Sequence, residues 1–204
     1  MALPSTRERI LDAAAHVMGT RGLAATTTKE IARAAGFSEA ALYKHFRDKE
    51  ELFLCLLSER LPPLMSLLDE LPGRAGRGTV TANLEQVARA AVDFYEEVVP
   101  IGAALFSDPE LLAHHRERLR ESGMGPQRPF DVVSAYLRAE QRLGRLSRSA
   151  KPSVAAALLI GACFQRAFLR SFLGEQAGAD ADQVFARDAV RTLLRSLSPE
   201  QASD

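Results

Sequence analysis

The chain has 204 residues, 47% hydrophobic and 25% charged, which is the composition of an ordinary globular protein with one or two domains. Its 26 basic and 26 acidic residues cancel, so overall charge indicates no nucleic-acid partner, and any such signal must be local. The two cysteines, Cys55 and Cys163, lie far apart, which argues against a disulfide framework and a cysteine-based zinc site. We expect both to be buried free thiols.

No membrane-spanning segment is expected. The longest uncharged apolar run, VAAALLIGACF at 154–164, is shorter than the ~18 residues that a spanning helix needs. The first residues, MALPSTRERILDAAAHVM, lack the unbroken apolar core of a signal peptide. We therefore expect a cytoplasmic protein without a membrane partner.

The hydrophobic spacing is helical nearly throughout and predicts an all-α fold of about nine helices. Residues 5–8 (STRE) form a capping box that starts a first helix, which ends at Gly22. Residues 27–30 (TTKE) form a second capping box, and Gly36 ends the short helix that follows, because glycine adopts the left-handed conformation at no steric cost.

Ser38 is predicted to cap a third helix, and Asp48 a fourth, which must break or kink at Pro62-Pro63. Further helices are expected over 80–98, ended by Pro100, and over 109–120, 129–143, 152–173 and 180–197, the last one capped by Asp180. The predicted domains are a small head, residues 1–48, and a larger remainder, residues 49–204.

Residues 28–46 have the spacing of a helix-turn-helix. Ala32 is small enough for a second helix to approach, Gly36 supplies the turn, and Leu42 fills the shared core. Residues 1–50 hold eight basic and six acidic side chains, a net charge of +2, so the local charge is compatible with a DNA-binding head.

The third predicted helix has distinct faces when it is wound at about 100° per residue. Leu42 and Phe46 then share the inward face, whereas Ala40 and Lys44 point directly outward with Tyr43 on one flank. A small residue permits close approach to a DNA groove. A lysine can meet a phosphate or a guanine edge, and a tyrosine can donate to a phosphate or pack on a thymine methyl.

Other polar residues flank this outward face. Thr27 and Thr28 stand at the N-terminus of the preceding helix, where the helix dipole favours a phosphate, and Lys49 can do the same at the start of the fourth helix. His45 is predicted to lie half-buried at the edge of the core. Glu39 is an anion near the expected DNA face, which can favour the helix dipole or accept from a cytosine amine.

Residues 26–53, TTTKEIARAAGFSEAALYKHFRDKEELF, resemble the DNA-binding signature of the tetracycline-repressor (TetR) family in the paired threonines, I-A-x-x-A-G-F-S, L-Y-K-H-F and K-E-E-L-F. The resemblance implies a homodimeric transcription regulator, most often a repressor, with a C-terminal ligand-binding domain. It implies DNA contacts at Thr27, Thr28, Ser38, Ala40, Tyr43, Lys44, His45 and Lys49. Two positions depart from the pattern: glycine is common where Ala40 stands, and Glu39 often has a neutral or basic counterpart.

The resemblance also implies that the chain after about residue 50 binds an effector and that the last two helices form a dimer. Effector pockets are apolar with a few polar groups. The candidate residues are Phe94, Tyr95, Phe106, His114, Tyr136, Phe164 and Phe168, with Asn83, His115, Gln165 and Arg166 as possible polar anchors. Each aromatic residue is also an ordinary candidate for the hydrophobic core.

The segment 152–173 is apolar almost all round, and a helix of that kind must be covered on all sides. A partner subunit is a natural cover, and the small residues of this segment allow close crossing of two helices. The predicted dimer interface comprises Leu158, Gly161, Ala162, Phe185, Ala189 and Leu193. The alternative is that both helices belong to the core of a single subunit.

Catalytic and metal-binding signatures are absent from the sequence. It contains no G-x-S-x-G, no glycine-rich phosphate loop and no paired-carboxylate constellation, so we expect no enzyme and no cofactor. Adjacent residues on a helix, such as His114 and His115, point about 100° apart and do not chelate as an i,i+4 pair does. The prediction is a repressor released by a small, largely apolar effector. The alternative is an architectural or protein-partnered DNA-binding regulator without an effector.

Overall fold

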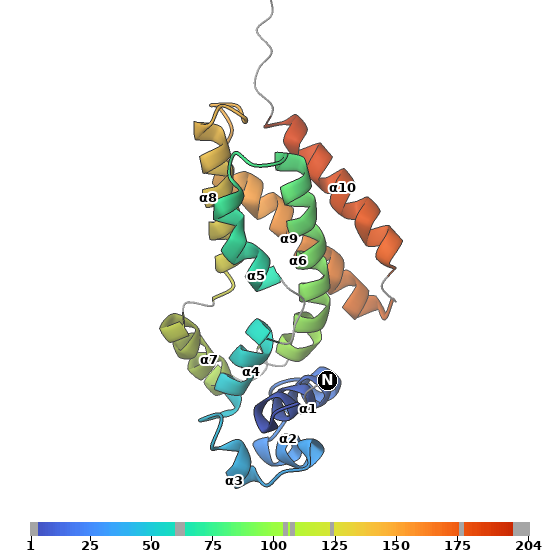
Figure 1. The fold of residues 1–204 in the computed structure, drawn as a ribbon. Coiled ribbons are helices and arrows are strands. Elements are labelled where there is room, and N and C mark those ends of the chain that lie inside the picture. Colours follow the sequence, from blue (N-terminus) through green and yellow to red (C-terminus); the bar gives the residue numbers. More distant parts are fainter. Residues whose placement is uncertain are drawn as a thin grey trace, which may run out of the picture. The chain divides into compact units, whose positions relative to one another are not determined.

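The computed structural model describes residues 4–59, 64–103, 106, 109–122, 125–175 and 178–197. In these ranges it contains ten α-helices, one 3-10 helix and no strand, which confirms the predicted all-α class (Figure 1). One more helix is present than was predicted, because α5 (Leu64–Glu70) follows directly after the proline pair, where no separate helix was expected. The proline pair itself lies outside the described residues.

The chain forms two compact units. The first contains the described residues up to 59 and those from Glu97 to Gly125, and the second contains the described residues from 64 to Glu96 and from 126 onward. The first unit thus includes more than the predicted head of residues 1–48. That head was defined by its expected function, and its boundary stays a prediction. Five helices lie wholly in the first unit: α1 (Thr6–Arg21), α2 (Thr28–Ala35), α3 (Glu39–Leu42), α4 (Lys49–Glu59) and α7 (Pro109–Ser122).

Both predicted capping boxes at the start of the chain are present. The Ser5 hydroxyl accepts from the backbone N–H of Glu8, and the Glu8 carboxylate accepts from the backbone N–H of Ser5 at 2.7 Å. Gly36 ends α2 with φ 78° and ψ 29°, the left-handed conformation that the sequence predicts there. These helices enclose a hydrophobic cluster, and its largest side chains include Ile10, Leu11, Met18, Ile31, Leu42, Phe46, Leu52 and Phe53.

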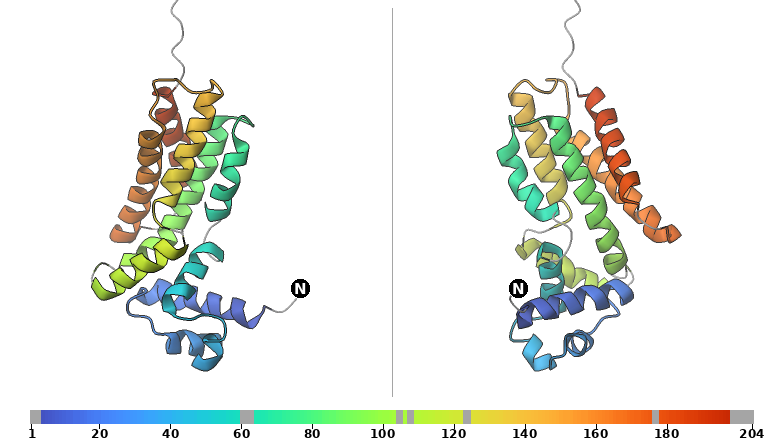
Figure 2. Two further views of the ribbon diagram at one scale, coloured as in Figure 1. Left: turned by 90° about the vertical axis from the view of Figure 1, so that its left-hand side faces the viewer. Right: turned by 45° about the vertical axis from the view of Figure 1, so that its right-hand side comes forward.

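The second unit is built from α5, a 3-10 helix (Leu71–Arg74), most of α6 (Val80–Gly102), α8 (Arg128–Arg142), α9 (Pro152–Leu173) and α10 (Ala179–Arg195). The two views in Figure 2 show α9 beside α8 and α10. Among the described residues, α9 alone is long and apolar enough to cross a bilayer, with a mean hydropathy of 1.5. It also carries two arginines, Arg166 and Arg170, that pair with a carboxylate of α10.

Two predicted helix boundaries in the C-terminal part of the chain are wrong. The α6 helix does not end before Pro100 but continues to Gly102, because a proline in the last turn removes only its own hydrogen bond. Asp180 does not cap α10, since the helix begins at Ala179 and Gly178 occupies the N-cap position. The Asp180 carboxylate therefore stands inside the first turn, where the helix dipole still favours it.

A buried ion-pair network joins three helices of the second unit. Asp182 of α10 accepts from Arg170 of α9 at 2.7 and 2.8 Å and from Arg166 Nε at 2.8 Å. Arg170 also donates to Glu96 of α6 at 2.5 Å. Burial opposes ionisation of Asp182, but the hydrogen bonds from the two arginines outweigh it and lower the pKa of that carboxyl. The network thus fixes α10 to α9, and α9 to α6.

Replacing Asp182 with alanine should lower the free energy of unfolding by about 3 kcal/mol, because Arg170, 9% exposed, would lose a buried counter-ion. Urea unfolding at pH 7 measures this change. The carboxyl has a lowered pKa, so its contribution is present above the ordinary aspartate pKa of 3.8 and is lost as the pH falls below it.

Glu117→Ala is the control for an exposed ion pair. Glu117 pairs with Arg120 at 2.7 Å and its side chain is 60% exposed, so this change should cost less than about 0.5 kcal/mol. Equal effects of the two substitutions would contradict a stabilising role for the buried network.

Candidate nucleic-acid interface

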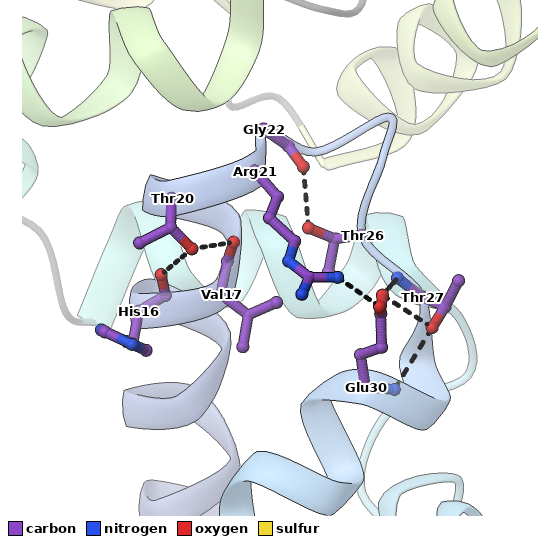
Figure 3. Close-up of polar contacts among 8 residues, drawn as sticks. All are labelled: His16, Val17, Thr20, Arg21, Gly22, Thr26, Thr27 and Glu30. Carbon is purple, nitrogen blue, oxygen red and sulfur yellow. Dashed lines mark hydrogen bonds and ion pairs between the residues drawn. The ribbon is translucent and has the colours of Figure 1, made fainter.

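The junction between α1 and α2 fixes the N-terminus of α2 (Figure 3). Arg21 at the end of α1 forms an ion pair with Glu30 of α2 at 2.5 Å, and Glu30 also accepts from the Thr27 backbone and hydroxyl at 3.0 Å. Thr26 is 1% exposed, and its hydroxyl donates to the carbonyl of Gly22 at 2.7 Å. Of the three consecutive threonines, Thr26 therefore has a structural role. Thr27 is the N-cap of α2 and Thr28 is its first residue.

The turn between α2 and α3 is stabilised from α1. Phe37 N donates to the Ala32 carbonyl at 2.8 Å, and the Arg9 guanidinium lies 4.6 Å from the centre of the Phe37 ring. Arg9 also donates to the Ala35 carbonyl at 3.0 Å. A Cβ at Gly36 would lie 3.2 Å from Arg9 Nη2, so glycine suits this position for space as well as for its φ.

The third helix is shorter than predicted. Its N-cap is Ser38, as expected, but α3 comprises only four residues and ends at Leu42. Beyond it, His45 N bonds to the Leu42 carbonyl three residues back at 2.9 Å, so the chain tightens into turns. The prediction of a half-buried His45 is wrong, because its side chain is exposed. Leu42 and Phe46 are buried, as predicted.

The surface formed by α3 and the following turn carries the residues that were expected to point outward. Ala40 and Lys44 are exposed, and Tyr43 is 50% exposed. Glu39 is half-buried, because its carboxylate accepts from the hydroxyl of Thr28 at 2.6 Å. The Tyr43 hydroxyl lies 3.2 Å from the same Thr28 oxygen. Glu39 thus has a partner inside the head that its sequence position did not indicate.

The remaining candidates are partly occupied by local contacts. The Ser38 hydroxyl accepts from Ala41 N at 3.2 Å, and Lys49 Nζ lies 3.4 Å from the Ala24 carbonyl. A groove of about 520 Å³ runs between α2 and α3. It is lined by Thr27, Lys29, Glu30, Arg33, Phe37, Ser38 and Glu39.

Lys29 and Arg33, both exposed, were not among the predicted DNA-binding residues. Their i,i+4 spacing places two cations on one face of α2, which is the signal that could have found them.

The predicted effector residues divide between the two units. Burial and the neighbouring Glu140 carboxylate raise the pKa of Tyr136 to about 12, against the effect of the Asn83 amide, which donates to the Tyr136 oxygen at 2.9 Å. This ring belongs to the core. Three other predicted rings form an edge-to-face and stacked series: Tyr95 lies 5.4 Å from Phe164, and Phe164 lies 6.3 Å from Phe168.

Phe94 is 5% exposed and meets Tyr95 edge-on at 5.6 Å, which extends this series towards the core. Phe106, in the other unit, is 81% exposed, and the side chain of His114 lies outside the described residues. Among the possible anchors, Arg166 pairs with the buried Asp182 at 2.8 Å. His115 is buried in the first unit, 5.5 Å from the Phe53 ring.

Comparison with known proteins identifies the head and the C-terminal part separately. Residues 10–56 match the family model of bacterial regulatory proteins of the tetR family, and residues 116–196 match the C-terminal domain of AefR-like transcriptional repressors. The chain belongs to the TetR family. Residues 10–56 thus form the helix-turn-helix head of a family of transcriptional regulators, and the family is one of non-enzymes.

Three curated proteins are similar to the chain, each over a different length. The chain is 30% identical over 141 residues to an uncharacterised regulator, YvkB of Bacillus subtilis, which covers 69% of this chain and 63% of that protein. It is 46% identical over 48 residues to AcrR of Shigella flexneri, covering 24% and 22%. The chain thus spans less than two thirds of these relatives. It is 28% identical over 151 residues to the nucleoid occlusion factor SlmA of a Marinomonas species, covering 74% and 73%.

Solved structures share the TetR-family fold at low identity. A putative regulator of Mesorhizobium loti aligns with a TM-score of 0.68 at 21% identity, covering 95% of this chain and 96% of that one. SmeT, the repressor of a Stenotrophomonas maltophilia multidrug efflux pump, aligns with a TM-score of 0.65 at 24% identity, covering 96% and 92%. These likenesses establish the fold.

Within this TetR-family fold, α9 and α10 share an exposed apolar face. A groove of about 820 Å³ lies between them, lined by five of the six predicted interface residues: Leu158, Ala162, Phe185, Ala189 and Leu193. Leu158 is 61% exposed, and Val184, which also lines the groove, is 45% exposed. The sixth residue, Gly161, is half-buried on α9.

Proposed function

We propose that the protein is a cytoplasmic, homodimeric repressor that binds a near-palindromic operator and releases it when a small, largely apolar effector binds the C-terminal domain. The observation that carries the DNA-binding mode is the exposed surface of Ala40, Tyr43 and Lys44, directly above the buried Leu42 and Phe46. Residues with no role in the core thus face solvent on a segment that the buried Leu42 and Phe46 anchor.

Each residue of this surface has a distinct use in a major groove. The methyl group of Ala40 leaves room for close approach, and Lys44 supplies a charge for a phosphate or a guanine edge. Lys29 and Arg33 of α2 add cations that suit the phosphate backbone, which gives affinity and register rather than sequence preference. Predicted contacts from Thr27, Ser38, His45 and Lys49 would complete the interface.

Dimerisation through α9 and α10 is supported by the exposed groove described above. A large exposed apolar patch on a soluble protein marks an interaction site, and most homo-oligomers are two-fold dimers. In a two-fold dimer the same groove lies on both copies, so Leu158 and Phe185 of one copy would meet the corresponding groove of the other. Two heads then suit two half-sites of an operator.

The effector is proposed from the ring series and from relatives. One similar structure is a complex of SmeT with triclosan, and another is FadR of Bacillus subtilis in complex with stearoyl-CoA. Both ligands carry large apolar parts, which suits a site containing Tyr95, Phe164 and Phe168. Release would follow if the effector favoured a conformation that no longer fits the operator, by no more than its differential affinity for the two states.

A second candidate function is supported by the similarity to a nucleoid occlusion factor. In this alternative the protein binds DNA as an architectural or protein-partnered regulator and takes no small effector. The burial of Tyr136 and Phe94, which are 1% and 5% exposed, is compatible with it.

Lys44→Ala should weaken binding to every duplex and reduce the slope of log K against log salt by about one, because one phosphate contact is lost. Tyr43→Ala should weaken binding chiefly to preferred sequences. Duplexes that the wild-type protein selects from a random library, titrated by fluorescence anisotropy at several salt concentrations, measure both effects. Lys151→Ala, an exposed lysine of the second unit, is the control. Wild-type binding by both head variants would refute the assignment.

Leu158→Arg should convert the dimer into a monomer, because a charge would be buried in the groove between α9 and α10. Sedimentation velocity across a range of protein concentrations measures the change. Leu143→Arg is the matched control, since Leu143 is 56% exposed on a different surface and its replacement should leave the dimer intact. An unchanged dimer in the Leu158 variant would contradict this interface.

A long-chain acyl-CoA or triclosan should release the protein from its selected duplex, and Phe168→Ala should raise the concentration needed by about tenfold through lost apolar contact. Anisotropy of a labelled duplex during ligand titration gives this measurement. Phe106→Ala is the comparison variant. Phe106 was also a predicted effector residue, but it lies exposed in the other unit. If no compound of an apolar panel released the DNA, the effector-free alternative would be favoured.

A further inference from the structure

An acidic side chain stands in the middle of the proposed DNA-reading surface. Glu39 is the first residue of α3, next to the exposed Ala40. A carboxylate that faced the DNA would repel phosphates. Glu39 instead turns towards α2, where its Oε1 lies 2.6 Å from Thr28 Oγ1, and it is only half-exposed.

The direction of the hydrogen bonds follows from the chemistry of the three groups. An ionised carboxylate can only accept, so the Thr28 hydroxyl must donate its single proton to Glu39. Thr28 Oγ1 has then no proton left for Tyr43, whose hydroxyl lies 3.2 Å away. Tyr43 must therefore donate to Thr28, and a one-way chain runs from Tyr43 through Thr28 to Glu39.

This chain restricts what Tyr43 can do at the protein surface. Phosphate oxygens only accept hydrogen bonds, so a tyrosine whose proton is already donated inside the head has none for a phosphate. Its oxygen retains a lone pair, which can accept from an adenine or cytosine amine. Its ring, half of which is exposed, can also pack on a thymine methyl.

We propose that Glu39 is a positioning residue that, through Thr28, fixes Tyr43 for base reading and withholds it from the phosphate backbone. The proposal rests on the proposed DNA-binding function and adds a determinant of operator specificity to it. It assigns Glu39 no contact with DNA. Tyr43 lies in the turn just beyond α3, after the buried Leu42, so the contact with Thr28 adds support from α2.

The test compares substitutions that separate charge from hydrogen bonding. Binding is measured to a duplex selected by the wild-type protein and to a scrambled duplex, and the ratio of the two affinities is the readout. Glu39→Ala, Thr28→Val and Tyr43→Phe should each lower this ratio by about tenfold, the scale of a hydrogen bond to a charged group. The slope of log K against log salt should stay the same in Tyr43→Phe, because no phosphate contact is lost.

Glu39→Gln is the conservative control. It retains an acceptor oxygen for Thr28 but removes the charge, so affinity for both duplexes should rise while their ratio stays within about twofold of wild type. The double variant Thr28→Val/Tyr43→Phe should lose no more than either single variant, because both changes interrupt one chain. Circular dichroism melting curves establish that each variant is folded.

Two results would overturn the proposal. If Glu39→Ala preserved the affinity ratio as Glu39→Gln does, the residue would act through its charge alone. If the effects of Thr28→Val and Tyr43→Phe added fully, the two side chains would act separately. Failure of the proposed function has a different signature, since the wild-type protein would then select no duplex from the library at all.

Discussion

The burial of Leu42 and Phe46 is the constraint on which the rest of the head depends. A four-residue helix has no stability of its own in water, because forming its first turn costs more than its few hydrogen bonds return. Its position is therefore set by these two anchors in the core and by the left-handed turn at Gly36. Once they are fixed, Ala40 and Lys44 can only face solvent. The interface is exposed as a consequence of what lies beneath it.

Hydrogen bonds of the two threonines at the start of α2 also hold this surface in place. Hydroxyl protons of Thr27 and Thr28 are both donated inside the head, to Glu30 and Glu39 respectively. Neither hydroxyl is then available to a phosphate as a donor without breaking an internal hydrogen bond. Affinity for the backbone would accordingly come from the cations and the first backbone N–H groups of α2, and the threonines would serve to orient their neighbours.

Much of this arrangement could be predicted from the sequence where the signal was local. The capping boxes at Ser5 and Thr27 and the turn at Gly36 involve residues within four positions of one another, so spacing alone revealed them. The errors arose where the outcome depended on a distant partner or on where a helix stops. His45 was predicted half-buried and is exposed in the turn after α3, and the partner of Glu39 lies eleven residues away on another helix.

The proposed coupling between effector binding and the dimer would depend on the ion-pair network of the second unit. Asp182 ties α10 to Arg170 of α9, and Arg170 also holds Glu96 of α6. Removing one partner of a buried ion pair costs about 3–5 kcal/mol, whereas allosteric coupling free energies are typically about 1–3 kcal/mol. Under the proposed mechanism, an effector that moved α6 would carry α9 and α10 with it rather than break this network. The groove of the proposed dimer would be displaced as a unit, so a change at the effector site would reach the partner subunit without any rearrangement inside α10.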